Sequence, residues 1–81
     1  MQTVLMKRKP EVMRAMGRRH SSLYNDINNG LLTQPVRIGV QSVAWPDYEI
    51  DAITRARIAG KSDDEIRALV SELHAMRKAA A

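Results

Sequence analysis

The chain has 81 residues, no cysteine and a formal net charge of +4 at pH 7. A chain of this length forms one small domain whose thin core cannot enclose a substrate in a deep pocket, so no stand-alone enzyme is expected. The lack of cysteine excludes disulfides and thiolate metal sites. No apolar run approaches the ~20 residues that span a bilayer, and no signal peptide is recognisable, so the chain is expected to be cytoplasmic.

The positive charge is concentrated in the first half of the chain. Residues 1–45 carry seven Lys and Arg against two acidic residues, whereas residues 46–81 carry six against seven. A basic stripe attracts polyanions, so this asymmetry favours a nucleic-acid partner. A solvated basic face that maintains solubility is the alternative.

The first predicted helix spans residues 10–16, after a short β-leaning run at residues 3–6. Pro10 suits the first turn of a helix, and Gly17 suits the position just past its end. Three apolar side chains at helical spacing form its buried stripe: Val12, Met13 and Met16.

A second short helix follows the turn that contains Gly17. Leu23, Tyr24 and Ile27 share one face of this helix, which is expected to be buried. The helix is expected to end at residues 28–30, Asn-Asn-Gly. The polar residues of the segment fall on its other sides: Arg19, His20, Ser22, Asn25 and Asp26. Two short helices joined by such a turn predict a helix-turn-helix.

A period of two replaces the helical period in the middle of the chain. Large apolar side chains alternate over residues 36–38 and 43–45, with residues 39–42 as the connecting loop. This pattern predicts a β-hairpin, and a hairpin directly after a helix-turn-helix is a wing. Trp45 is in phase with Val43, which favours a place in the core over a base-stacking platform.

A third helix is predicted to open at Pro46 and Asp47 and to stop at Gly60. Acidic residues occupy its first turn, where they complement the positive end of the helix dipole. Its apolar members are Ile50, Ile53, Ala56 and Ala59, with Ile58 beside them.

Ser62 and Glu65 have the spacing of a capping box, which predicts a fourth helix over residues 63–78. Its apolar stripe is regular: Ile66, Leu69, Val70, Leu73 and Met76. The stripe either docks on the domain or pairs with a partner chain, and docking is favoured because a small core needs every apolar face.

Catalytic and metal-binding constellations are not recognisable in the sequence. His20 and His74 stand 54 positions apart without cysteine or paired carboxylates at ligand spacing, so neither a metal nor another cofactor is expected. His20 is interpreted as a phosphate contact or an exposed residue, and His74 as a solvated residue of the last helix. Ser21 and Ser22 have no recognisable general base, so nucleophilic catalysis by them is not expected. Tyr24 is not expected to be a recombinase nucleophile, because such enzymes need a far larger domain than this chain provides.

Nucleic-acid binding is the chemistry that the pattern favours. The segment 7–19 holds six basic residues and one acid, and it covers the first helix and the turn into the second. In a helix-turn-helix the N-terminal residues of the second helix enter the major groove. The candidate groove-facing residues are Arg18, Arg19, His20, Ser21, Ser22, Tyr24 and Asn25. The candidate backbone and wing contacts are Lys7, Arg8, Lys9, Arg37, Gln41 and Ser42. Asp26 is expected to mark the flank of this surface, and helix capping is the alternative role for the two serines.

Over residues 4–59 the chain resembles the AlpA family of phage and mobile-element regulators and, more widely, the winged-helix excisionases. Four segments carry the resemblance: residues 17–24 (GRRHSSLY), 30–39 (GLLTQPVRIG), 43–45 and 49–52. The joint spacing of six residues is its most specific part: Gly17, Tyr24, Gly30, Pro35, Gly39 and Trp45. Four positions depart from the family pattern. Arg18 replaces the usual leucine and Arg19 the usual serine cap, while Asn25 and Gln41 stand where basic residues are common.

The resemblance implies a mainly α fold with a small β-hairpin, a winged helix-turn-helix of the MerR and excisionase type plus a C-terminal amphipathic helix. Residues 1–60 are expected to form the DNA-binding domain, and residues 61–81 the helix that docks on it or self-associates. The implied function is sequence-specific binding of double-stranded DNA, without catalysis, as a transcriptional regulator or an excisionase of a prophage. A homodimer or cooperative array on DNA and an integrase are the implied partners, and no membrane is involved. The alternatives are a protein-interaction module that dimerises through residues 62–78, and RNA binding, which the scarcity of aromatic residues disfavours.

Overall fold

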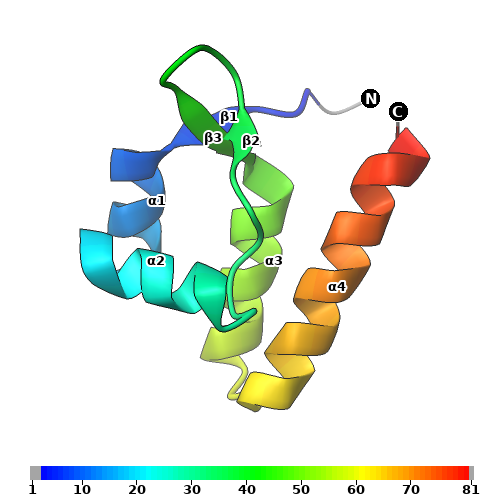
Figure 1. The fold of residues 1–81 in the computed structure, drawn as a ribbon. Helices are drawn as coiled ribbons and strands as arrows, with labels where there is room; N and C mark the ends of the chain where they lie inside the picture. Colours follow the sequence, from blue (N-terminus) through cyan, green and yellow to red (C-terminus); the bar gives the residue numbers. More distant parts are fainter. Residues whose placement is uncertain (1–2, 81) are drawn as a thin grey trace.

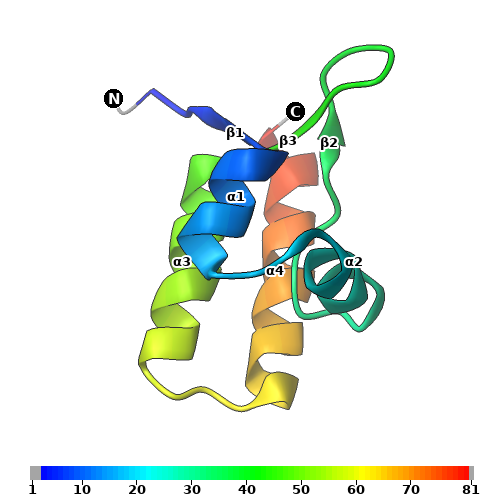
Figure 2. The same cartoon turned by 90° about the vertical axis from the view of Figure 1, so that its left-hand side faces the viewer.

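The computed structural model describes residues 3–80. The elements follow in the order β1 (Met6–Arg8), α1 (Lys9–Met16), α2 (His20–Asn28), β2 (Val36–Arg37), β3 (Val43–Pro46), α3 (Asp47–Ile58) and α4 (Asp63–Ala80). The three strands form an antiparallel sheet of order β1-β3-β2 at one end of the helices (Figure 1). Helices α3 and α4 run antiparallel, and α2 lies crosswise to both (Figures 1 and 2). The predicted fold class is confirmed: the chain is mainly α with a small antiparallel sheet, which is compatible with a winged helix-turn-helix.

The first strand differs from its prediction. It covers Met6–Arg8 rather than residues 3–6, because its register is set by pairing with β3, in which Lys7 lies opposite Trp45. The backbone N–H of Asp47 also donates to the carbonyl oxygen of Leu5 at 2.8 Å, which fixes the chain just before the strand. This pairing partner is some forty residues away, so local propensity could not define the bounds.

Local end signals define the helices. Gly17 has φ 64° and closes α1, a left-handed conformation that costs glycine little. At the start of α4 the N–H of Glu65 donates to Ser62 Oγ at 3.2 Å, and the N–H of Ser62 donates to Glu65 Oε1 at 3.0 Å. The predicted capping box is therefore confirmed.

The core collects side chains from all four helices and from β3. Trp45 is fully buried, and its Nε1 donates to the carbonyl oxygen of Thr33 at 2.8 Å, so the core placement expected for this residue is confirmed. Its buried apolar neighbours in the core are Val12, Leu23, Ile27, Leu32, Ile50, Ile53, Ile66, Val70 and Leu73. Because three of these belong to α4, the apolar stripe of α4 docks on the rest of the domain.

The apolar stripes of the last two helices end earlier than the sequence predicts. Ile58 is 80% exposed and Ala59 is exposed, because α3 extends past the core before the turn to α4. Met76 is half exposed at the far end of α4. No helix within residues 3–80 combines the length and the apolarity that crossing a bilayer requires.

Candidate nucleic-acid interface

The N-terminal turn of α2 faces solvent, as a groove-entering helix requires. Arg19, His20 and Ser21 are exposed, whereas Leu23 and Ile27 are buried against the core as predicted. Figure 2 shows α2 and the loop between β2 and β3 on the same side of the molecule, away from α3 and the start of β1. One surface can therefore use both the helix and the wing.

Within residues 3–80, the start of α2 has no side-chain cap. Arg19 occupies the N-cap position and makes no side-chain cap hydrogen bond. Ser21 and Ser22 lie inside the first turn of α2 and not at its N-cap position, which Arg19 occupies. The free N–H groups and the helix dipole consequently give this end of α2 a positive potential.

Three of the candidate residues form a cluster that joins α1 to α2. The ammonium group of Lys9 lies 5.3 Å from the centre of the Tyr24 ring, a cation–π distance. The His20 ring is tilted against the same tyrosine with 4.9 Å between ring centres. The Lys9–Tyr24–His20 cluster therefore holds a cation and an imidazole beside Arg19. Each residue was expected at the interface, but their mutual contact depends on the helix crossing.

Arg18 and Asp26 occupy different places from those expected. Arg18 forms a bidentate ion pair with Asp26, with Nε to Oδ2 and Nη2 to Oδ1 both at 2.9 Å. The Asp26 side chain, expected at the flank of the groove-facing surface, is buried, while Arg18 is 42% exposed. The hydrogen bonds and the charge of Asp26 raise the pKa of Arg18. A buried carboxylate requires such a partner, so Arg18 is committed to the fold.

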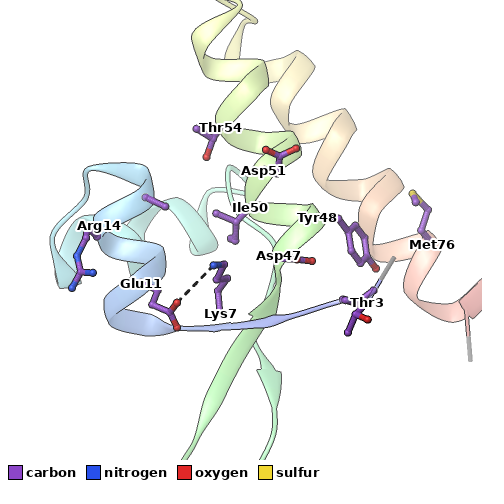
Figure 3. A pocket seen from close by; sticks show the side chains of 12 residues that line it. Thr3, Lys7, Glu11, Arg14, Asp47, Tyr48, Ile50, Asp51, Thr54 and Met76 are labelled. Carbon is purple, nitrogen blue, oxygen red and sulfur yellow. Dashed lines mark ion pairs between the residues drawn. The ribbon is translucent and has the colours of Figure 1, made fainter. Parts of the chain in front are cut away.

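The basic residues of the first strand do not share a face. Lys7 points into an open groove between α1 and α3, where its Nζ lies 3.7 Å from Glu11 Oε2 (Figure 3). Asp47 and Asp51 line the same groove. Alternate residues of a strand point to opposite sides, so Arg8 is directed elsewhere and is exposed. The three carboxylates would repel a phosphate near Lys7.

The wing contributes one cation and an apolar tip. Arg37 is exposed, and its Nη2 lies 3.4 Å from the carbonyl oxygen of Val40. Gln41 is exposed and Ser42 is half-buried. Val40 is 86% exposed, so the loop also presents an apolar side chain to solvent.

Sequence reasoning missed a polar network that joins α3, α4 and Gln34. Glu49 is fully buried and accepts from Arg77 Nε at 2.7 Å and from Nη2 at 2.6 Å. His74 is not a freely solvated residue, because its Nε2 accepts the N–H of Gln34 at 3.0 Å. The available signal was the spacing of Arg77, which stands four residues after Leu73 and so continues the buried stripe of α4.

Comparison with known proteins agrees with the resemblance in the sequence. Residues 6–58 match the family model described as "Prophage CP4-57 regulatory protein (AlpA)". The "Uncharacterized protein ORF88" of Enterobacteria phage P4 is 39% identical over 54 residues, which are 67% of this chain and 61% of that protein. The match thus spans less than two thirds of that relative. No solved structure matches the chain significantly. The family match runs from β1 to the end of α3, and on this basis the chain belongs to the AlpA family of prophage regulatory proteins.

Proposed function

We propose that the chain is a sequence-specific double-stranded DNA-binding regulator of a prophage or integrative element. It acts by occupying and shaping DNA, without catalysis. The observation that carries the proposal is the uncapped, solvent-facing start of α2, flanked by Arg19 and by the Lys9–Tyr24–His20 cluster. Helix N-termini bind phosphate through free N–H groups, and adjacent cations strengthen that binding. The wing, with Arg37, lies on the same side.

The structure divides the candidate cations into two groups. Lys7 and Arg18 are paired with carboxylates, so we assign them to the fold. Within residues 3–80 the remaining candidates form no ion pair and are assigned to phosphates: Arg8, Lys9, Arg19 and Arg37. The exposed polar groups of α2 that remain for base edges are His20, Ser21 and Asn25.

A binding titration tests the proposal. If four phosphates are neutralised, log K falls against log salt with a slope of about −3.6. The probe is a pool of random duplex fragments, followed by a footprint on the fragments that bind best. Single-stranded and duplex RNA of the same length test the alternative partner. A slope near zero on duplex DNA, or tighter binding to RNA, would contradict the proposal.

Arg19→Ala is the diagnostic variant. It removes a phosphate contact, which reduces the salt slope by about one, or a base contact, which costs about 1–3 kcal/mol and relaxes preference at one base pair. Arg57→Ala is the matched control. Arg57 is also exposed, but it lies in the last turn of α3 and not on the surface formed by α2 and the wing. Equal weakening by the two variants would mean that net charge, and not this surface, drives binding.

The two regulatory forms of the proposal differ in their footprint. An excisionase occupies several adjacent sites beside a recombination site, bends the DNA and cooperates with an integrase. A transcriptional regulator protects a promoter region and needs no integrase. Dimerisation through α4 is not favoured as a rival, because its apolar residues Ile66, Val70 and Leu73 are buried in the core.

A further inference from the structure

The segment between α2 and the wing, residues 29–35 (here the linker), is held by α4 through its main chain. Arg67 Nε donates to the carbonyl oxygen of Asn29 at 2.8 Å. His74 Nε2 accepts the N–H of Gln34 at 3.0 Å, and Arg77 Nη2 donates to the carbonyl oxygen of Gln34 at 2.7 Å. Three side chains of one helix therefore fix the two ends of the linker.

Arg77 is itself held rigidly. Its guanidinium makes two bonds to Glu49, which has no exposed surface, and only about a quarter of the Arg77 side chain is exposed. A fully buried carboxylate without its partner is strongly destabilising, so this arginine cannot leave at little cost. Arg77 thus connects α3, α4 and the linker at one point.

The linker has no regular secondary structure that could define its path. Its first residues are fixed to the end of α2, where the N–H of Leu31 donates to the carbonyl oxygen of Asp26 at 2.8 Å. Farther along, Thr33 accepts from Trp45 and Gln34 is held by α4. The position of β2 relative to α2 therefore depends on contacts from outside the linker.

The family match adds an independent observation. It ends at residue 58, so α4 lies outside it, whereas Glu49, which needs Arg77, lies within it. Within residues 3–80, the ion-pair partner of the buried Glu49 in the matched segment comes from α4.

We infer that α4 is a clasp that sets the position of the wing relative to α2, with Arg77 and His74 as positioning residues for DNA binding. This inference rests on the proposed function. When the contacts of Arg77 and His74 to Gln34 are removed while α4 stays packed on the core, the helix and the wing remain folded but no longer match the spacing of the DNA surfaces that they contact together. Affinity then falls although no DNA-contacting residue has changed.

The first test removes the buried pair as a whole. The double variant Glu49→Met/Arg77→Met leaves the net charge unchanged, and replacing both members of a buried ion pair by apolar residues of similar volume generally preserves folding. It deprives the carbonyl oxygen of Gln34 of its donor. We expect roughly five- to tenfold weaker binding to the selected duplex, the scale of one or two hydrogen bonds, with an unchanged salt slope. Lys78→Met is the control, since it removes a cation from the same helix at an exposed position.

The second test uses substitutions at His74, which leave the buried pair intact. His74→Gln retains an acceptor for the N–H of Gln34 and is expected to preserve affinity, whereas His74→Leu is expected to weaken it. Amide hydrogen exchange of Gln34 gives a readout without DNA. Exchange should accelerate in the leucine variant but not in the glutamine variant, while the melting temperatures of the two stay similar.

The outcomes distinguish a failure of DNA binding from a failure of the clasp. A wild-type chain that shows no salt-dependent binding to duplex DNA removes the proposed function, and the role of the clasp in DNA binding falls with it. A wild-type chain that binds, together with clasp variants of equal affinity and unchanged exchange at Gln34, overturns the clasp alone.

Discussion

At the scale of single residues, the adjacent arginines of the helix-turn-helix have different surroundings. Arg18 is bound to the buried Asp26, whereas Arg19 faces solvent without a cap partner. The sequence predicts both as groove-facing, because composition and spacing treat them alike. The burial of Asp26 depends on tertiary packing, so the ion pair between Arg18 and Asp26 could not be deduced from the sequence pattern.

The two arginines are therefore expected to respond oppositely to truncation. Arg18→Ala leaves a buried carboxylate uncompensated and should lower the free energy of unfolding by about 1–3 kcal/mol, a range that allows for the partial exposure of Arg18. Arg19→Ala should leave stability unchanged and weaken DNA binding. Thermal unfolding and the titration measure the two effects. In the double variant Arg18→Ala/Asp26→Ala part of the stability should return, and a failure to regain any would argue against the pair as the cause.

At the scale of elements, the sequence predicts what local chemistry controls. The four helices lie where apolar periodicity, Gly17 and the Ser62 capping box place them. The wing is also found where the period of two predicts it, although β2 ends at Arg37 and leaves Ile38 half-exposed. The first strand was misplaced, because its hydrogen-bonding partner is distant in sequence. The candidate interface was predicted as a set of residues, but its Lys9–Tyr24–His20 cluster requires the crossing of two helices.

The capping box at the start of α4 is expected to make a pH-dependent contribution to the stability of the protein. Hydrogen bonds from the backbone and then the side chain of Ser62 lower the pKa of Glu65 below its ordinary value of 4.5. Because the pKa of Glu65 is lower in the folded state, its ionised form stabilises the protein at pH values above the ordinary pKa. This contribution to the free energy of unfolding is lost as the pH falls through the folded-state pKa. Glu65→Gln should thus be less stable than wild type at pH 7, with a difference that shrinks towards pH 3. Thermal unfolding at both pH values measures this, and a difference of equal size at pH 3 would exclude the ionised carboxylate as its source.

At the scale of the whole molecule, α4 is part of the domain and not an appendage. It supplies Ile66, Val70 and Leu73 to the common core and the only partner of Glu49 within residues 3–80. The sequence predicted the apolar stripe and favoured its docking. It did not reveal the polar contacts that hold the linker, because these involve main-chain groups whose positions depend on the fold. Residues on both sides of position 60 therefore contribute side chains to one core.

A chain that ends at Gly60 is expected not to fold cooperatively. Burial of three aliphatic side chains of this size contributes about 5–9 kcal/mol, which is comparable with the ~5–15 kcal/mol total stability of a typical domain. The truncation also leaves Glu49 buried without a counter-charge, which adds to the loss. Circular dichroism should show reduced helicity with no sigmoidal thermal transition, and DNA binding should be lost. A chain that ends at Lys78 is the control, because it retains Ile66, Val70 and Leu73 for the core and Arg67, His74 and Arg77 for the linker, and it should melt like the full chain. A cooperative transition at the wild-type temperature in the chain that ends at Gly60 would show that residues 1–60 fold independently and that α4 is not needed for their stability.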